Sequence, residues 1–125
     1  HGFERPPPHL PAGSIIHKVY ELYVNIYHTV ATFPKRDRYT LGVRLEQNIL
    51  ALLELLILAE SKDGPSKLLI LNKSDNHIKI LKMLTRVAYE VKAMPQNRYI
   101  MSEEKLLEIG RMLGGWIKQA KTKRP

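Results

Sequence analysis

The sequence predicts an all-α protein, an up-down-up-down four-helix bundle, from three observations. Four successive segments carry apolar residues at spacings of three or four, which place them on one face of an α-helix. No segment shows the alternating pattern of a β-strand. The connections between the four segments are short, and short connections join helices that pack as antiparallel neighbours.

The first helix is expected over about residues 14–33, with Ser14 as a possible N-cap and Pro34 after its end. Its expected core residues share one face and are Ile16, Val19, Tyr23, Ile26, Val30 and Phe33. Residues 1–13 are proline-rich, and we expect them to be a flexible leader or an expression remnant. Residues 14–125 are then expected to form one bundle domain.

The second helix is expected over about residues 40–61, after a basic connector at residues 35–38. Leucine and isoleucine residues between positions 49 and 58 cover nearly its whole circumference. One side of a helix normally faces water in a small bundle, so this excess of apolar surface predicts burial against another subunit. We assign Leu52 and Leu56 to that oligomer interface.

The third helix is expected over about residues 66–94, between a turn at residues 63–65 and Pro95. The polar residues 73–76 near its start predict a kink or a weak point in the helix. Its expected core residues are Ile78 (or Ile80), Leu81, Leu84, Val87, Ala88 and Val91.

The fourth helix is expected to begin at residues 102–105, where acidic side chains suit the positive end of the helix dipole. Its expected core residues are Leu106, Ile109, Leu113, Trp116, Ile117 and Ala120. Gly110, Gly114 and Gly115 lie inside this helix, where each costs about 0.5–1 kcal/mol relative to alanine. Close approach of another helix, within the bundle or from a neighbouring subunit, would offset that cost, and we assign Gly114 to an oligomer interface.

All of the surplus positive charge lies in the second half of the chain. Residues 1–63 contain 7 Lys and Arg against 7 Asp and Glu, and residues 64–125 contain 13 against 5. The formal net charge of +8 therefore belongs to the second half, which contains the third and fourth helices. A concentrated positive surface attracts polyanions and releases their counterions on binding, so nucleic acid or an acidic protein surface is the first partner to expect.

Two sets of basic residues share helix faces in this second half. The candidate binding residues are Lys79, Lys82 and Arg86 in the third helix and Arg111, Lys118 and Lys121 in the fourth. No acid lies among the third-helix set, and we expect the two sets to be adjacent in space because their helices are consecutive. Each set is either a solvated helix surface or a binding surface. The absence of paired acids favours binding for the third-helix set, and the presence of a second basic stripe on the next helix favours it for the fourth-helix set.

Several classes of site are disfavoured by the composition. The chain has no cysteine, which excludes disulfides and thiolate metal sites. The longest apolar run, residues 49–59, is interrupted by Glu54 and is too short to span a bilayer. No His-Glu pair has metal-binding spacing, and no catalytic constellation is present. We therefore expect a noncatalytic, cytoplasmic protein without a metal or cofactor.

The sequence resembles a known family over residues 16–121. The segment EIGRMLGGWIK at residues 108–118 looks like the last-helix signature of accessory variability determinant (Avd) proteins, which belong to diversity-generating retroelements. RYTLG at residues 38–42 is similar to the start of the family's second helix, and LKMLTR at residues 81–86 to its basic third helix. The four-helix proteins encoded in 23S rRNA intervening sequences share the general fold and are the alternative, with an RNA-related or unknown role.

The resemblance implies a homopentameric barrel whose positive surface binds RNA, DNA and a dedicated reverse transcriptase. It also implies a noncatalytic accessory role in mutagenic cDNA synthesis and retrohoming by that reverse transcriptase. The family's basic pair corresponds here to Lys82 and Arg86. Lys82 stands where arginine can occur, and lysine lacks the bidentate contacts of arginine, so partner affinity is expected to differ if a planar contact is required.

Overall fold

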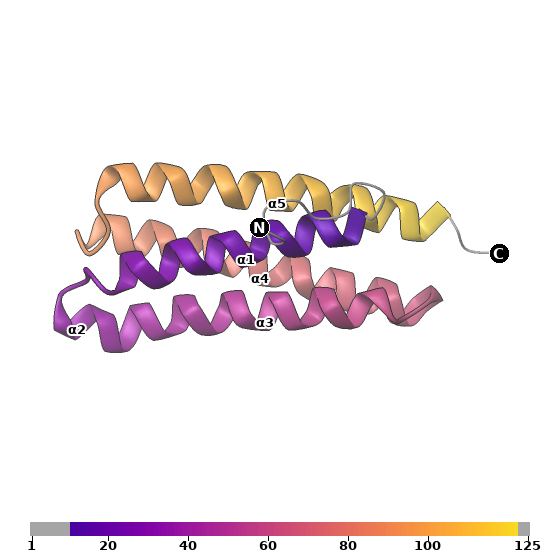
Figure 1. Cartoon of the computed structure of the whole chain (residues 1–125), viewed down its shortest axis with the longest axis horizontal. Helices are drawn as coiled ribbons and strands as arrows, with labels where there is room; N and C mark the ends of the chain where they lie inside the picture. Colours follow the sequence, from indigo (N-terminus) through magenta and orange to yellow (C-terminus); the bar gives the residue numbers. More distant parts are fainter. Residues whose placement is uncertain (1–10, 123–125) are drawn as a thin grey trace, which may run out of the picture.

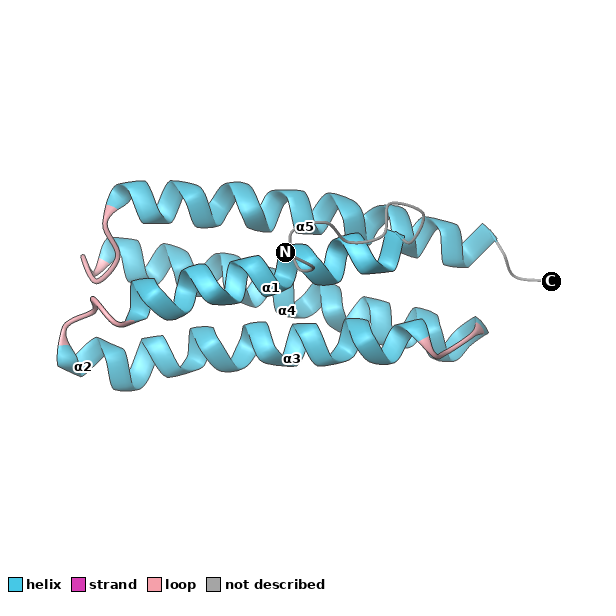
Figure 2. Ribbon diagram, in the orientation of Figure 1, coloured by secondary structure: helices cyan, strands magenta, loops and turns pink. Residues whose placement is uncertain are grey.

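Four long helices run side by side in an antiparallel bundle in the computed structural model (Figure 1). The structure describes the backbone of residues 11–122 and the side chains of residues 14–122. The elements in chain order are α1 (Pro11–Val30), α2 (Lys35–Asp37), η1 (Arg38–Gly42), α3 (Val43–Glu60), α4 (Gly64–Glu90) and α5 (Gln96–Thr122). The described residues include no strand (Figure 2). The expected all-α four-helix bundle is therefore confirmed.

The long helices occupy the four corners of the bundle in a fixed order. α1 packs against α3 and α5, and α4 packs against the same two helices. The order around the bundle is therefore α1, α3, α4, α5, with α1 and α4 on opposite corners (Figure 1). Each side of the bundle is formed by two helices that are neighbours in this order. Within the described residues, none of these helices combines the length and apolar character that a bilayer span requires.

The beginnings of α1 and α5 lie earlier in the chain than the sequence predicts. α1 begins at Pro11 rather than Ser14, and residues 1–10 of the expected leader lie outside the described residues. α5 begins at Gln96 rather than Ser102. The Ser102 hydroxyl donates to a backbone carbonyl one turn earlier, at 2.9 Å. Serine can bond back to the helix interior as well as cap a helix, so its presence did not mark the start.

The expected connector before the second helix is itself helical. α2 starts directly after Pro34, whose carbonyl accepts hydrogen bonds from the amides of Asp37 and Arg38, each 2.9 Å long. η1 adds a π-helical turn that leads into α3. A Cβ atom at Gly42 would lie 2.5 Å from Val30 Cγ1, so glycine permits the close contact between this turn and α1.

α4 is a regular helix across residues 73–76, where the sequence predicts a kink or a weak point. Ser74 lies in this segment and is fully buried. Its hydroxyl donates to the carbonyl of Ile70 at 2.9 Å, which satisfies the polar group inside the core. The polar segment therefore belongs to the packed length of the helix.

The end of α4 is set by a Schellman motif. α4 ends at Glu90, before the expected end near residue 94. The Lys92 amide donates to the Tyr89 carbonyl at 3.0 Å, and the Ala93 amide donates to the Ala88 carbonyl at 2.9 Å. Lys92 occupies the left-handed position of this motif, with a φ angle of 66°, where glycine is the favoured residue.

We expect Lys92→Gly to raise the free energy of unfolding by about 0.5–1 kcal/mol, because glycine adopts the left-handed conformation without the steric cost of a Cβ atom. Urea unfolding followed by circular dichroism measures the difference. Lys92→Ala is the matched control, since it removes the same long side chain but keeps Cβ, and it should not stabilise the chain. Equal stabilisation by both substitutions would point to the lysine side chain instead of the backbone.

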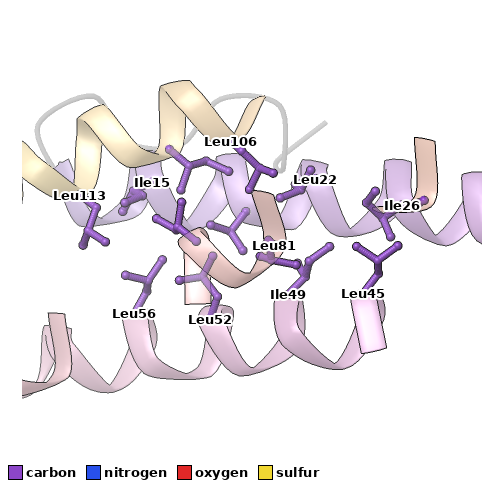
Figure 3. Close-up of a cluster of buried hydrophobic side chains, with 14 of the residues drawn as sticks. Ile15, Leu22, Ile26, Leu45, Ile49, Leu52, Leu56, Leu81, Leu106 and Leu113 are labelled. Atoms are coloured by element: carbon purple, nitrogen blue, oxygen red, sulfur yellow. The ribbon is translucent and has the colours of Figure 1, made fainter. Parts of the chain in front are cut away.

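The hydrophobic core runs along the bundle between the four long helices (Figure 3). Its fully buried side chains include Ile15, Leu22, Ile26, Leu45, Ile49, Leu52, Leu56, Leu81, Leu106 and Leu113. The core face predicted for α5 is confirmed, because all six of its residues are either buried or packed against the core. The face predicted for α1 is partly wrong: Ile15 and Leu22 are buried, while Ile16 and Tyr23 pack only at the edge.

The core face of α4 also differs from the prediction. Val87 and Val91 were expected inside but are 42 % and 54 % exposed. Thr85 is buried instead, and its hydroxyl donates to the carbonyl of Lys82 at 3.0 Å. Apolar residues lie on two faces of this helix, so their spacing identifies the helix without showing which face is inside.

Leu52 and Leu56 of α3 have no exposed surface in the single chain. They belong to the core of one bundle and cannot contact a second subunit, which corrects their assignment to an oligomer interface. The excess apolar surface of α3 lies elsewhere on the helix. Leu50, Ile57 and Leu58 are 39 %, 52 % and 43 % exposed.

Candidate nucleic-acid and partner interface

The first set of candidate cations lies on the outer surface of α4, and we call it the α4 stripe (Lys79, Lys82 and Arg86). The sequence suggests that no acid neutralises it, and the structure corrects this. Asp75 Oδ2 lies 3.3 Å from Lys79 Nζ, and Glu90 Oε2 lies 2.6 Å from Arg86 Nε. Both acids stand one helical turn outside the stripe, so the i to i+4 spacing brings them onto its face.

Arg86 is held by contacts from both α4 and α5. Its Nε donates to Glu90, and its Nη1 donates to the Tyr99 hydroxyl at 3.4 Å. The guanidinium carbon lies 5.9 Å from the centre of the Tyr99 ring. Hydrogen bonds to Tyr99 and Glu90 raise the pKa of Arg86 further above its ordinary range. Because arginine is charged at any physiological pH, these contacts orient the group and leave its charge unchanged.

Tyr99 is itself fixed by its neighbours. Its hydroxyl donates to Glu103 Oε2 at 2.8 Å. Its ring stacks on that of Tyr89, with 4.6 Å between the centroids and 9° between the planes. Glu90, Arg86, Tyr99 and Glu103 therefore form one polar chain that ties the end of α4 to the start of α5.

Lys82 makes no ion pair in the part of the chain that the structure describes. It lines a surface depression of about 320 Å³ with Glu103 and Glu104 and with two apolar residues of α5, Ile100 and Leu107. The α4 stripe therefore adjoins a mixed surface of cations, acids and exposed apolar side chains. Its centre is Lys82, the cation that can be offered to a partner without breaking an existing ion pair.

The second set of candidate cations, the α5 stripe (Arg111, Lys118 and Lys121), is exposed and unpaired. None of the three forms an ion pair among the described residues. The glycines between them are open as well: no atom outside the helix backbone lies within 4 Å of a Cβ built at Gly110, Gly114 or Gly115. Close approach by another helix of the same chain therefore does not explain them. The assignment of Gly114 to an oligomer interface stays a prediction.

The two stripes follow one another along the molecule instead of lying side by side as expected. α4 and α5 are antiparallel, with Arg86 against Tyr99 at one end and Lys67 Nζ 5.6 Å from the Trp116 ring at the other. The α5 stripe therefore lies beyond the α4 stripe, beside the beginning of α4 (Figure 1). At about 1.5 Å per residue, Lys121 lies about 33 Å along α5 from Tyr99.

We call the six cations together the basic track. Its members are Lys79, Lys82, Arg86, Arg111, Lys118 and Lys121. Acids accompany its α4 half, where Asp75 and Glu90 pair with cations and Glu103 lies beside Lys82. None of the cations of the α5 half has such a partner in the described residues, so their charge is not neutralised by an ion pair. The sequence analysis found no acid among the α4 cations because it considered only the residues between them.

Sequence reasoning also missed Tyr99, Asp75 and Glu90 as parts of this site. Asp75 and Glu90 carry a readable signal, since each stands four residues from a cation on the same helix. Tyr99 carries none, because its contact with Arg86 depends on how two helices pack.

Comparison with known protein families identifies a match that covers most of the chain. A family model described as bAvd-like matches residues 14–120, which include five of the six cations of the basic track and stop one residue before Lys121. No curated protein matches the chain.

Proposed function

We propose that this chain, which belongs to the bAvd-like family, is an Avd-type accessory protein. It binds nucleic acid and the reverse transcriptase of a diversity-generating retroelement. In this role it supports mutagenic cDNA synthesis and retrohoming in the cytoplasm without catalysing a reaction itself. It does so as a homo-oligomer, and the resemblance to Avd proteins specifies a pentamer.

The observation that carries this proposal is the basic track. Its α5 half presents three cations without ion-pair partners in the described part, spread over about 15 Å of helix at about 1.5 Å per residue. A row of cations along a rod matches an extended polyanion, whose phosphates repeat along its length, better than it matches a compact acidic site. RNA or DNA therefore suits the α5 half.

The α4 half of the basic track suits a protein partner. An oriented arginine beside stacked tyrosines, with exposed apolar groups near Lys82, has the composition of a protein interface. Ile100 and Leu107 are 46 % and 52 % exposed there. We therefore assign the reverse transcriptase to the α4 half.

Co-purification with the reverse transcriptase encoded beside this chain tests the proposal. We expect Lys79→Ala with Lys82→Ala to lower the association rate about tenfold, because exposed charges at an interface mainly steer encounter. This pair leaves the contacts of Arg86 with Glu90 and Tyr99 intact, so the fold should not change.

Lys35→Ala with Lys62→Ala removes the same charge from exposed positions outside the basic track and should bind normally. A wild-type chain that does not co-purify with the enzyme would contradict the proposed function. If the Lys79→Ala, Lys82→Ala variant binds the reverse transcriptase as well as the control does, the reverse transcriptase does not bind the α4 half. The proposed function itself would not be affected.

A further inference from the structure

The depression beside Lys82 carries charges of both signs that are not paired with one another. We call it the α4–α5 depression, and its lining residues are Lys82, Ile100, Glu103, Glu104 and Leu107. Neither carboxylate forms an ion pair with Lys82 or with another cation in the described part of the chain. The lining therefore contains two carboxylates and one ammonium group, although the whole chain carries a formal net charge of +8.

The two carboxylates of the α4–α5 depression differ in their contacts. The Tyr99 hydroxyl donates to Glu103 Oε2 at 2.8 Å, and Arg86 Nη1 donates to the same hydroxyl at 3.4 Å, so Glu103 is held in a fixed position. The exposed side chain of Glu104 makes no hydrogen bond or ion pair with the described residues. Glu104 is therefore the carboxylate that can pair with a partner's cation without breaking an existing contact.

Ile100 and Leu107 form the two apolar ends of the α4–α5 depression along α5. They are seven residues apart, which puts them on the same side of the helix and about 10.5 Å apart along its axis. Both are about half exposed. Glu103 and Glu104 lie between them at helical spacing, so this stripe of α5 is apolar at both ends and acidic in the middle.

An α-helix of a partner matches the spacing of these apolar ends, and an extended strand does not. Residues seven apart in a partner helix also lie on one side and about 10.5 Å apart. Three residues of a strand span about 10 Å, but the side chains at the two ends of that span point to opposite faces. An amphipathic helix can therefore contact Ile100 and Leu107 at once, as helices do when they bind in a groove.

The charges of the α4–α5 depression determine which helix fits. A lysine or arginine three or four residues after the first apolar residue of that helix would lie against Glu104. Lys82 on the α4 side favours an acid on the flank of the same helix. A phosphate backbone would meet two carboxylates for one ammonium group, so a protein helix suits this place better than nucleic acid does.

We infer that the α4–α5 depression binds an amphipathic α-helix of the reverse transcriptase, an inference that rests on the proposed function. Two apolar residues of that helix, seven apart, cover Ile100 and Leu107. A lysine or arginine between them pairs with Glu104. The carboxylates attract this helix and repel phosphates, which keeps the two partners on different halves of the basic track.

Charge reversal at Glu104 tests the inference. Glu104→Lys should lower affinity for the purified reverse transcriptase at least about tenfold, because it places a cation opposite a cation. It should leave affinity for a short DNA duplex at or above the wild-type value, because it removes a charge that repels phosphates. Glu60→Lys is the matched control, at an exposed position at the end of α3, and should bind the enzyme normally. Surface plasmon resonance and fluorescence anisotropy measure the two affinities.

Truncation of Leu107 tests the apolar end of the depression. Leu107→Ala should lower affinity for the reverse transcriptase about tenfold, because the partner helix loses an apolar contact. Leu69→Ala is the control, since Leu69 is 58 % exposed on α4 and lies outside the depression. Alanine favours helices, so both chains should keep the wild-type circular dichroism. Equal effects of the two substitutions would contradict a specific contact at Leu107.

Cross-linking identifies the segment that occupies the depression. The chain has no cysteine, so Leu107→Cys provides a single attachment point for a photo-activated cross-linker. In the complex with the reverse transcriptase, the captured peptide should be helical and should carry a lysine or arginine between apolar residues seven apart. Capture of an extended segment, of nucleic acid or of a second copy of this chain would overturn the inference.

The remaining outcomes separate this inference from the proposed function. A wild-type chain that does not bind the reverse transcriptase would contradict the proposed function itself. A folded Glu104→Lys chain that binds the enzyme as well as wild type would overturn the inference and leave the proposed function standing. If Glu104→Lys does not fold, Glu104→Gln removes the charge without adding another, and unchanged enzyme affinity in that variant would overturn the inference in the same way.

Discussion

Leu52→Glu is expected to abolish the folded state of the single chain. Leu52 is fully buried in the core, and truncating a buried leucine to alanine already costs about 2–5 kcal/mol. A carboxylate at the same place would lose its hydration without gaining a partner, which adds a further large cost. Since small domains are stable by about 5–15 kcal/mol, the sum is enough to unfold this one. Circular dichroism should show loss of the helical signal at neutral pH.

Ile57→Glu is the matched control for this prediction, because it places the same carboxylate five residues further along α3. Ile57 is 52 % exposed, so the new charge stays hydrated and the helix should persist. A folded Leu52→Glu chain would show that α3 is turned differently in the bundle. The pair thus separates the core face of α3 from its outer surface, which the apolar pattern of the sequence does not distinguish.

The fold was predictable where apolar residues lie on one face of a helix. α5 is the clearest case, since Leu106, Ile109 and Leu113 recur at spacings of three and four and are all buried, although Leu107 beside them is exposed. α3 and α4 were harder, because apolar residues also occupy their outer faces. Apolar residues occur on exposed surfaces as well as in cores, so their spacing alone does not show which face of these helices is buried.

Helix ends were less predictable than helix faces, for local physical reasons. α4 stops at Glu90 because Lys92 takes a left-handed conformation that its residue type does not favour. α2 begins right after Pro34, where the charged residues resemble a loop but bond to the proline carbonyl. Both outcomes depend on backbone hydrogen bonds that composition does not reveal.

The sequence predicted which residues belong to the candidate site, but it did not predict how they are arranged along the bundle. All six cations of the basic track are exposed, as a binding surface requires. Their distribution along the bundle follows from the antiparallel packing of α4 and α5, which places the two stripes end to end. The roles of the two halves then depend on acids and on Tyr99, whose contacts form only in the folded chain.

Reversing the charge of the α5 stripe is expected to cause the largest loss of nucleic-acid binding. Arg111→Glu, Lys118→Glu and Lys121→Glu together change the formal net charge by −6, from +8 to +2. If each cation neutralises one phosphate, the slope of log affinity against log salt should fall by about 2.7 per chain, at about 0.9 per phosphate of duplex DNA. We expect affinity for a short duplex to fall at least about 100-fold in low salt, measured by fluorescence anisotropy over a salt series. All three positions are exposed and unpaired in the described part, so the helix should remain folded.

A charge-matched control decides whether the position of the cations or only their number matters. Lys35→Glu, Arg36→Glu and Arg44→Glu also change the net charge by −6, at exposed positions in α2 and at the start of α3, the end of the bundle far from Lys121. A polyanion held along the basic track should respond weakly to this control, because charges more than a Debye length of about 10 Å away are largely screened at 0.1 M salt. Equal losses from the two triple variants would mean that net charge alone drives binding, and an α5 variant with the wild-type slope would exclude α5 from the interface. If the α4 half binds the reverse transcriptase and the α5 half binds nucleic acid, only the α5 variant should lose nucleic-acid affinity. That variant should still bind the reverse transcriptase.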